Sequence, residues 1–310
     1  MTRAVDDRHL PEDASDPPPA RATGRLRVDG AELHYEVCGR GPAIVFAHGL
    51  GGSHLSWWQQ VAHFARTHTC VTFAHRGFEP STLDAGGPDP ARFADDLAAL
   101  IDHLSIDRAH LVGQSMGGWT VVEYGLRHPG RTRSLVLSAT TGSIDHRRIA
   151  GLDPAALDAW KADVAAAAAQ CRSAGVHPAA GPRMAREQPA LHLLYRQIDE
   201  LSRGLDKDAL RAGLQAMRVR APDGLAATGV PVLLVSPGED IVIPPPALRA
   251  LARELPGARL VELEDAGHSP YFERAARFNT CLDAFFREVE ARPIADGGGD
   301  EAGRGPGGAR

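Results

Sequence analysis

The chain of 310 residues contains few cysteines and few aromatic residues, and only two of its basic residues are lysines. The four cysteines are far apart and form no C-x-x-C pair: Cys38, Cys70, Cys171 and Cys281. This spacing argues against both a zinc site and a compact disulfide framework. We therefore expect free thiols in a reducing compartment and no bound metal.

Long apolar runs are also absent. No stretch is long enough to span a bilayer, and the acidic, proline-containing N-terminal segment lacks the apolar core of a signal peptide. The net charge of −5 gives no polyanion-binding signature. These absences predict a cytoplasmic protein that binds neither membranes nor nucleic acid.

Composition divides the chain into a long central part and two tails. Residues 1–23 and 292–310 are rich in proline, glycine, alanine and charged residues, which predicts disordered tails. Between them, short apolar runs alternate with stretches of helical spacing, and Asp29-Gly30 separates the first two runs as a hairpin turn would. The runs expected to form strands are 26–28, 33–37, 43–47, 71–74, 110–112, 134–138, 230–235 and 260–263. The alternation predicts an α/β fold with a doubly wound, mostly parallel sheet.

One interval interrupts this alternation. About ninety residues separate the run at 134–138 from the run at 230–235, and their apolar spacing predicts helices near 157–168, 191–201 and 210–217. Helices inserted at this point would cover the carboxyl edge of the sheet, where ligands bind in open α/β folds. We expect a core formed by residues 24–142 and 223–291, with a helical cap at 143–222.

A glycine-flanked serine lies between a predicted strand and a predicted helix at 116–127. Residues 113–117 read G-Q-S-M-G, a pattern that places a serine on a sharp strand-to-helix turn. Gly113 and Gly117 remove side chains that would collide in such a turn. Ser115 is therefore a candidate nucleophile, and the Met116 amide is a candidate oxyanion donor.

A serine nucleophile needs a histidine base and a carboxylate that orients the base. Among fourteen histidines, His268 is the best placed, because it follows the last predicted strand directly. The preceding strand leads into residues 236–244, where Asp240 is preferred as the carboxylate, with Glu239 and Asp145 as alternatives. The order serine, acid, histidine along the chain is typical of one fold.

A second oxyanion donor is expected after the run at 43–47. Residues 48–52 read H-G-L-G-G, and their glycines would let the Leu50 amide approach a substrate carbonyl. A phosphate-binding loop is the alternative for such a glycine cluster, but neither common nucleotide-binding pattern is present. We expect His48 to serve as a structural hydrogen-bonding residue.

These motifs, together with D-I-V-I-P at 240–244 and G-H-S-P-Y at 267–271, resemble the serine α/β-hydrolase superfamily in its capped esterase, enol-lactonase and C–C hydrolase branch. The resemblance covers about residues 25–288. It implies an α/β-hydrolase sheet with a helical cap, a Ser115–His268–Asp240 triad and no organic or metal cofactor. The serine differs from the aspartate of haloalkane dehalogenases and epoxide hydrolases.

The chain departs from this pattern after the run at 71–74. The superfamily usually has D-x-R-G-x-G-x-S, whereas Ala74 replaces the aspartate here and Glu79 replaces a glycine. We therefore expect a differently shaped loop beside the active-site mouth.

The resemblance implies hydrolysis of a small to medium carboxylic ester or lactone, a small-molecule substrate, through an acyl-enzyme. Alternatives are C–C bond hydrolysis of vinylogous diketones, with cap arginines binding the substrate; a cofactor-independent lyase or cyclase; and a non-enzymatic ligand receptor. The arginines considered for the C–C reaction are Arg183, Arg186 and Arg196. Candidate apolar walls of the substrate pocket are Trp57, Trp58, Trp160, Met184 and Tyr195.

Overall fold

The computed structural model describes residues 18–83 and 87–292. Most of the two predicted tails lies outside these residues. The first strand, β1, begins at Arg21 and pairs in register with β2, so that Arg21 lies opposite Cys38 and Thr23 opposite Glu36. Assigning residues 21–23 to a disordered tail was therefore wrong, because their backbone is paired along the edge of the sheet.

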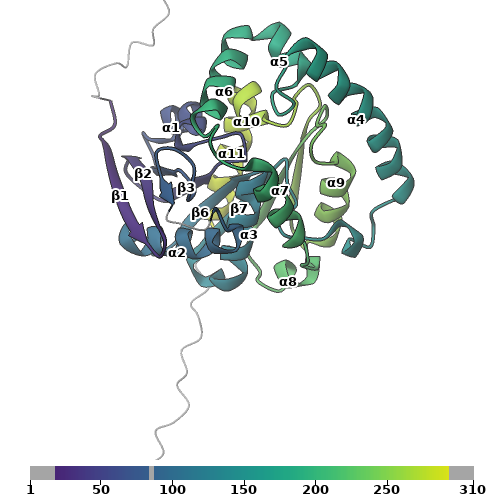
Figure 1. The fold of residues 1–310 in the computed structure, drawn as a ribbon. Coiled ribbons are helices and arrows are strands. Elements are labelled where there is room, and N and C mark those ends of the chain that lie inside the picture. Colours follow the sequence, from purple (N-terminus) through teal and green to yellow (C-terminus); the bar gives the residue numbers. More distant parts are fainter. Residues whose placement is uncertain (1–17, 84–86, 293–310) are drawn as a thin grey trace, which may run out of the picture.

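A single sheet forms the centre of the molecule (Figure 1). In the described residues it has nine strands in the order β1-β2-β4-β3-β6-β7-β8-β9, with β5 paired to β2. β1 and β2 are antiparallel, and the strands from β4 to β9 along this order run parallel. The strands are β1 (Arg21–Val28), β2 (Ala31–Gly39), β3 (Ala43–Ala47), β4 (Thr69–Phe73), β5 (Thr82–Leu83), β6 (Ala109–Gln114), β7 (Thr132–Ser138), β8 (Val232–Pro237) and β9 (Arg259–Leu263).

Both faces of the central parallel strands β3, β6, β7 and β8 are buried. Successive residues alternate between two cores, as Val45 of β3 shows by packing with one cluster while Ile44 and Phe46 pack with the other. The first core includes α2 (Phe93–His103), α3 (Met116–Arg127), α8 (Pro222–Ala226) and α9 (Pro245–Glu254). The second includes α1 (Trp58–Phe64), α10 (Pro270–Glu273) and α11 (Ala275–Glu290). This arrangement confirms the predicted doubly wound, mostly parallel α/β fold.

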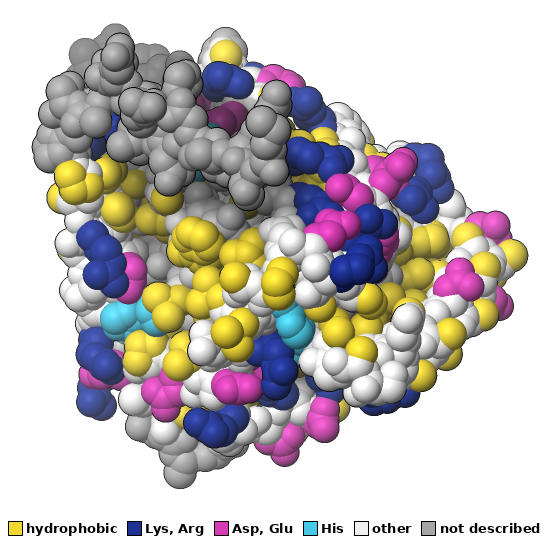
Figure 2. Space-filling view, turned by 90° about the horizontal axis from the view of Figure 1, so that it is seen from above, with side chains coloured by type: hydrophobic (Ala, Val, Ile, Leu, Met, Phe, Trp, Pro, Cys, Tyr) yellow, Lys and Arg dark blue, Asp and Glu magenta, His cyan; other side chains and the backbone are white. Residues whose placement is uncertain are grey.

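Five α-helices lie between β7 and β8 in the chain: α8 and, before it, α4 (Pro154–Ala174), α5 (Gly181–Glu187), α6 (Pro189–Leu201) and α7 (Lys207–Ala216). The Asp153 carboxylate caps α4, and Gly175 ends it in the left-handed conformation at φ 64°. Cys171 is the one fully buried residue of α4. Figure 2 shows the molecule from above, the side that carries α4 and α5 at the top of Figure 1. Hydrophobic side chains on this face are exposed and interleaved with charged ones.

Several local predictions are confirmed. Asp29-Gly30 forms the turn of the β1–β2 hairpin, and α3 spans the predicted residues 116–127. The strand expected at 230–235 instead begins at Val232, and the two-residue β5 and the helix α5 were not predicted. Among the described helices, none combines the length and the apolar character needed to cross a bilayer.

Candidate active site

Ser115 lies at the sharp turn between β6 and α3. Its backbone has a positive φ of 49°, which is rare for a residue with a side chain. A Cβ atom at Gly113 would lie 2.6 Å from the Gly117 carbonyl oxygen, and one at Gly117 would lie 2.1 Å from the Ala47 carbonyl oxygen. Only glycine fits at these two positions, so the G-x-S-x-G spacing follows from the close approach of α3 to β3 and β6.

His268 and Asp240 reach the same edge of the sheet from two other strands. Asp240 follows β8, His268 follows β9, and both side chains are buried. His268 Nδ1–H donates to Asp240 Oδ2 at 2.9 Å, which leaves Nε2 as the acceptor nitrogen. The other carboxylate oxygen, Asp240 Oδ1, accepts hydrogen bonds from the Val242 and Ile243 amides at 2.7 and 3.0 Å. The imidazole therefore has a defined orientation and tautomer.

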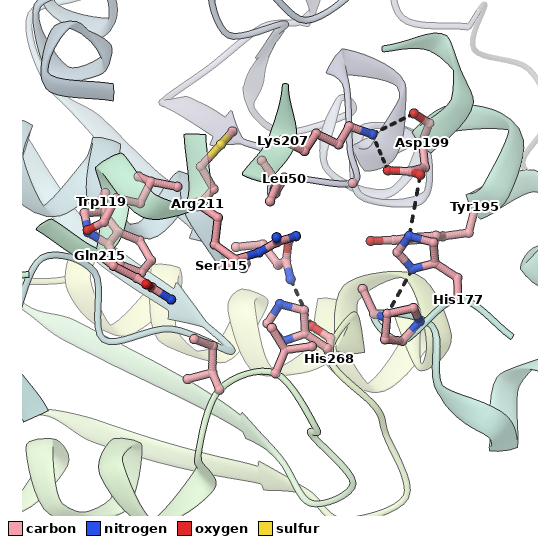
Figure 3. A pocket seen from close by; sticks show the side chains of 18 of the residues that line it. Leu50, Ser115, Trp119, His177, Tyr195, Asp199, Lys207, Arg211, Gln215 and His268 are labelled. Atoms are coloured by element: carbon pink, nitrogen blue, oxygen red, sulfur yellow. Dashed lines mark hydrogen bonds and ion pairs between the residues drawn. The ribbon is translucent and has the colours of Figure 1, made fainter. Parts of the chain in front are cut away.

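Ser115 and His268 line one cavity of about 410 Å³, together with Gln114, Leu50 and Met116 (Figure 3). No hydrogen bond joins Ser115 to His268 in the part of the chain that the structure describes. Catalytic hydrogen bonds are often long in an enzyme without substrate and shorten when substrate binds. The arrangement leaves room for a reacting group between the two side chains.

Leu50 and Met116 both line this cavity, and their backbone amides have no hydrogen-bond partner among the described residues. Leu50 follows β3, and Met116 is the first residue of α3, where amides have no partner inside the helix. A pair of unpaired amides beside a serine is suited to hold a negatively charged oxygen. The structure thus brings the predicted donors to the same cavity as Ser115.

The two alternative carboxylates are held elsewhere. Glu239 forms a forked ion pair with Arg183, with Nη2 of the arginine 2.6 Å from Oε1. Asp145 accepts the amide of Arg147 at 3.0 Å and is paired with the guanidinium of the same residue. Neither carboxylate bonds to His268.

Glu273, which the sequence analysis did not predict as part of the site, fixes the loop that carries His268. The buried carboxyl group of Glu273 accepts hydrogen bonds from the amides on both sides of the histidine, Gly267 at 2.8 Å and Ser269 at 3.0 Å. Gln114 Nε2 donates to the His268 carbonyl at 2.9 Å. Burial raises the pKa of Glu273 to about 8. The only sequence signal for this contact is the five-residue spacing from His268, which by itself predicts nothing about burial.

His48 shapes the loop that carries Leu50. Its ring is fully buried, with Nδ1 2.8 Å from the Gly49 carbonyl oxygen and Nε2 accepting the His75 amide at 3.1 Å. Burial lowers the pKa of His48 to about 3, so the ring is neutral at pH 7. This agrees with the structural role expected for His48.

The segment in which Ala74 and Glu79 depart from the superfamily pattern is anchored by other contacts. The Ala74 carbonyl accepts the Ser81 hydroxyl at 2.8 Å, and Arg76 forms a buried ion pair with Asp96. Glu79 is exposed, and its amide donates to Ser202 Oγ at 3.0 Å. The segment therefore contacts the interval between β7 and β8 through residue 79.

Of the five side chains predicted as pocket walls, the structure places only Tyr195 on the cavity. Trp57 is fully buried against Phe46 and Tyr271, and Met184 packs in the second core. Trp58 is 45% exposed at the surface. Trp160 donates its indole N–H to the Asp240 carbonyl at 2.8 Å without lining the cavity. These four predictions were wrong because a residue's distance from Ser115 depends on packing that spacing does not reveal.

The interval between β7 and β8 instead contributes mainly polar walls: His177, Asp199, Lys207, Arg211, Gln215 and Arg218. In Figure 3, Asp199 lies between Lys207 and His177, and Lys207 Nζ is 2.6 Å from Asp199 Oδ1. The arginines considered for C–C hydrolysis do not line this cavity. Arg183 is paired with Glu239, while Arg186 and Arg196 are 68% and 48% exposed. The expectation that these three bind substrate is not supported by their positions.

One group of side chains has the composition of a metal site. Ligand atoms of His34, Glu36 and His54 lie within 4.8 Å of one another. Glu36 already accepts two hydrogen bonds from Arg21, one of them from Nε at 3.0 Å. None of the three lines the cavity that contains Ser115. The reacting groups described above therefore do not include these side chains.

The chain matches known proteins along most of its length. The model of the alpha/beta hydrolase fold family matches residues 42–275. A putative non-heme bromoperoxidase, BpoC, of Mycobacterium tuberculosis is 31% identical over 84% of this chain and 99% of its own. The putative carbamate hydrolase RutD of Azorhizobium caulinodans is 27% identical over 84% and 97%. The structure of Est816, described as an N-acyl homoserine lactone degrading enzyme, matches with a TM-score of 0.68 and 28% identity over 84% of this chain and all of its own.

These similarities and the sheet order define the class of protein. The chain belongs to the α/β-hydrolase family, as its motifs indicated, and it is an enzyme of that family. Its relatives bear several different activities in their names, so the family alone leaves the substrate open.

Proposed function

We propose that the protein is a serine hydrolase that cleaves a small to medium carboxylic ester or lactone through an acyl-enzyme. The observation that carries this proposal is the arrangement of three side chains at one sheet edge. Ser115 is held on a strained turn, and His268, oriented by Asp240, lines the same cavity. This is the combination that activates a serine hydroxyl at neutral pH.

The reaction follows from the groups around the cavity. Ser115 Oγ attacks the substrate carbonyl while His268 Nε2 takes its proton, and Asp240 stabilises the imidazolium that forms. The amides of Leu50 and Met116 hold the negatively charged oxygen of the tetrahedral intermediate. His268 then protonates the leaving oxygen, and a water activated by the same base releases the acid.

The walls of the cavity support a substrate of modest size. A volume of about 410 Å³ lies in the range of small-molecule sites, and Trp119, Leu214 and Ile243 give it apolar sides. The named activity of Est816 on a lactone adds support for a cyclic or open ester. The carbonyl carbon and the leaving oxygen of an ester are the atoms that the mechanism requires.

We also propose a cytoplasmic location. All four cysteines are free thiols in the structure. Cys38 lies opposite Cys70 across β2 and β4, yet the two form no disulfide. Cys171 is buried. Free thiols suit a reducing compartment. Fractionation of cells that express the full chain tests the location, and we expect the protein in the soluble cytoplasmic fraction.

Steady-state kinetics test the proposed function. The parent protein is assayed with 4-nitrophenyl butyrate and with N-butanoyl homoserine lactone, beside Ser115→Ala. We expect turnover of at least one of the two substrates and a loss of at least ~10²-fold in kcat for the variant. Equal rates for parent and variant would refute Ser115 as the nucleophile. No turnover of either substrate by the parent would refute the ester and lactone class.

A further inference from the structure

Arg218 is a positively charged side chain on the cavity wall that has no partner. It follows α7, and among residues 18–83 and 87–292 nothing accepts a hydrogen bond from its guanidinium or forms an ion pair with it. Its Nε atom is buried and unpaired. An unpaired buried donor on a charged group is costly unless a ligand or water supplies an acceptor.

Lys207 and Arg211, the lysine and the other arginine that line the cavity, each have a carboxylate partner. Lys207 Nζ bonds both the carboxylate and the carbonyl of Asp199, at 2.6 and 2.9 Å. Arg211 forms an ion pair with Asp208 on the same helix. Among the cations that line the cavity, Arg218 is therefore the one without a carboxylate partner in the part of the chain that the structure describes.

Arg218 also has a fixed position. Its guanidinium carbon lies 4.9 Å from the centre of the Trp119 ring, and the Trp119 indole N–H donates to the Leu214 carbonyl at 3.0 Å. The negative charge of Asp145 acts to raise the pKa of Arg218. Both carboxylate oxygens of Asp145, however, accept hydrogen bonds from the guanidinium of Arg147. A guanidinium over the face of a tryptophan is attracted by the ring, and this attraction uses none of its hydrogen-bond donors.

We propose that Arg218 binds a carboxylate of the substrate, and that the enzyme prefers an ester or lactone that carries such a group away from the scissile carbonyl. The inference rests on the proposed hydrolase function and adds the chemical class of its substrate. A carboxylate offers two oxygens to the two parallel N–H bonds of a guanidinium. Burial lowers the pKa of Arg218, as expected for a cation that lacks this partner.

A matched pair of esters tests the preference. Mono-4-nitrophenyl adipate and 4-nitrophenyl hexanoate have acyl chains of nearly equal length, and only the first ends in a carboxylate. We expect the parent to have a kcat/KM at least about 10-fold higher for the adipate ester, the lower end of what a charged hydrogen bond contributes. Arg218→Met should remove this preference by lowering kcat/KM for the adipate ester at least about 10-fold more than for the hexanoate ester, and urea denaturation of the variant shows that it is folded.

Arg196→Met is the matched control. Arg196 lies on α6, is 48% exposed and does not line the cavity, so its loss should leave the preference unchanged. Equal kcat/KM values of the parent for both esters would overturn the proposal. So would an Arg218→Met variant that loses activity equally on both.

A binding measurement separates this proposal from the proposed function. Calorimetry with monomethyl adipate and methyl hexanoate uses the Ser115→Ala protein, with and without Arg218→Met, and requires no turnover. Monomethyl adipate should bind at least about 10-fold more tightly than methyl hexanoate only when Arg218 is present. Equal affinities would overturn the carboxylate proposal. If neither ester is cleaved but this difference is found, the hydrolase function fails and the carboxylate site remains.

Discussion

The two carboxylate oxygens of Asp240 have different partners. Oδ1 accepts the amides of Val242 and Ile243, which fixes the side chain, and Oδ2 accepts Nδ1–H of His268. Only an acceptor at the Oδ2 position keeps the proton on Nδ1 and leaves Nε2 free to take a proton from Ser115. Asp240 therefore determines which tautomer of the histidine is present.

Replacing Asp240 by asparagine tests this role. Its amide nitrogen would face His268 Nδ1 and favour the opposite tautomer, with the proton on Nε2. We expect kcat to fall by ~10²- to 10⁴-fold at pH 7, with little change in the free energy of unfolding. Ester kinetics and chemical denaturation measure the two quantities.

Glu239→Gln is the control for that substitution. The Glu239 pair with Arg183 lies at the surface, with the two side chains 37% and 34% exposed. Exposed pairs contribute little, so kcat should change by less than about 3-fold. A larger loss for Glu239→Gln than for Asp240→Asn would contradict the choice of Asp240.

At the scale of elements, the site depends on how closely α3 approaches the sheet. Ala47 at the end of β3 lies directly against Gly117 in the first turn of α3. This contact brings the start of the helix beside the loop that carries Leu50. A glycine in the helix thus allows the two proposed oxyanion donors, Leu50 and Met116, to lie at one cavity.

Gly117→Ala should disrupt that contact. The added Cβ would lie 2.1 Å from a backbone oxygen that cannot move without shifting β3. We expect the free energy of unfolding to fall by about 3 kcal/mol or more, the range of severe overpacking. Gly130→Ala, where nothing lies within 4 Å of the added atom, should change it by less than about 0.5 kcal/mol. Similar values for the two variants in urea denaturation would refute the close-approach argument.

The elements that the sequence predicted are those with strong local signals. Asp29-Gly30 favours a hairpin, and the helix after Ser115 ends at His128-Pro129, so β1, β2 and α3 were recognisable. The strand at 230–235 was placed two residues early because Val230 continues the apolar pattern, whereas β8 begins at Val232. β5 has two residues and α5 seven, too short for a periodic pattern to show.

The site was predictable to the extent that loops at strand ends meet at one edge of a parallel sheet. This rule brought residues 50, 115, 240 and 268 together without any knowledge of the interval between β7 and β8. The polar walls from that interval, such as Asp199 and Arg218, could not be predicted because their approach depends on helix packing. The prediction of Trp57 and Met184 as pocket walls was wrong for the same reason, because the positions of both side chains depend on packing.

At the scale of the whole molecule, Glu273 links stability to pH. Burial raises its pKa from the ordinary value of 4.5 to about 8, so the folded protein holds a proton that the unfolded chain has already released. Between these two pKa values the Glu273 carboxyl group binds fewer protons in the unfolded state than in the folded state, and its contribution to stability therefore falls as the pH rises.

We expect the contribution of Glu273 to the free energy of unfolding, measured as the difference between the parent and Glu273→Gln, to decrease between pH 5 and pH 8 and to level off above that range. The difference is the quantity to measure, because buried neutral histidines such as His48 contribute with the opposite sign below pH 6.5. Glu273→Gln should be less stable at pH 5, since its amide leaves the amide of Gly267 or Ser269 without an acceptor, and should lack this part of the slope. Urea denaturation at pH 5, 6, 7 and 8 measures both proteins. Parallel curves for parent and variant would show that Glu273 does not titrate in this range.

The central claim is that Ser115 is a nucleophile activated by His268. Its most direct test is reaction of the full-length protein with a fluorophosphonate, followed by mass spectrometry of the intact chain and of its peptides. We expect one adduct per chain, on Ser115, and strongly slowed labelling of His268→Ala. An adduct on another residue, or labelling of Ser115 at the same rate without His268, would contradict the account.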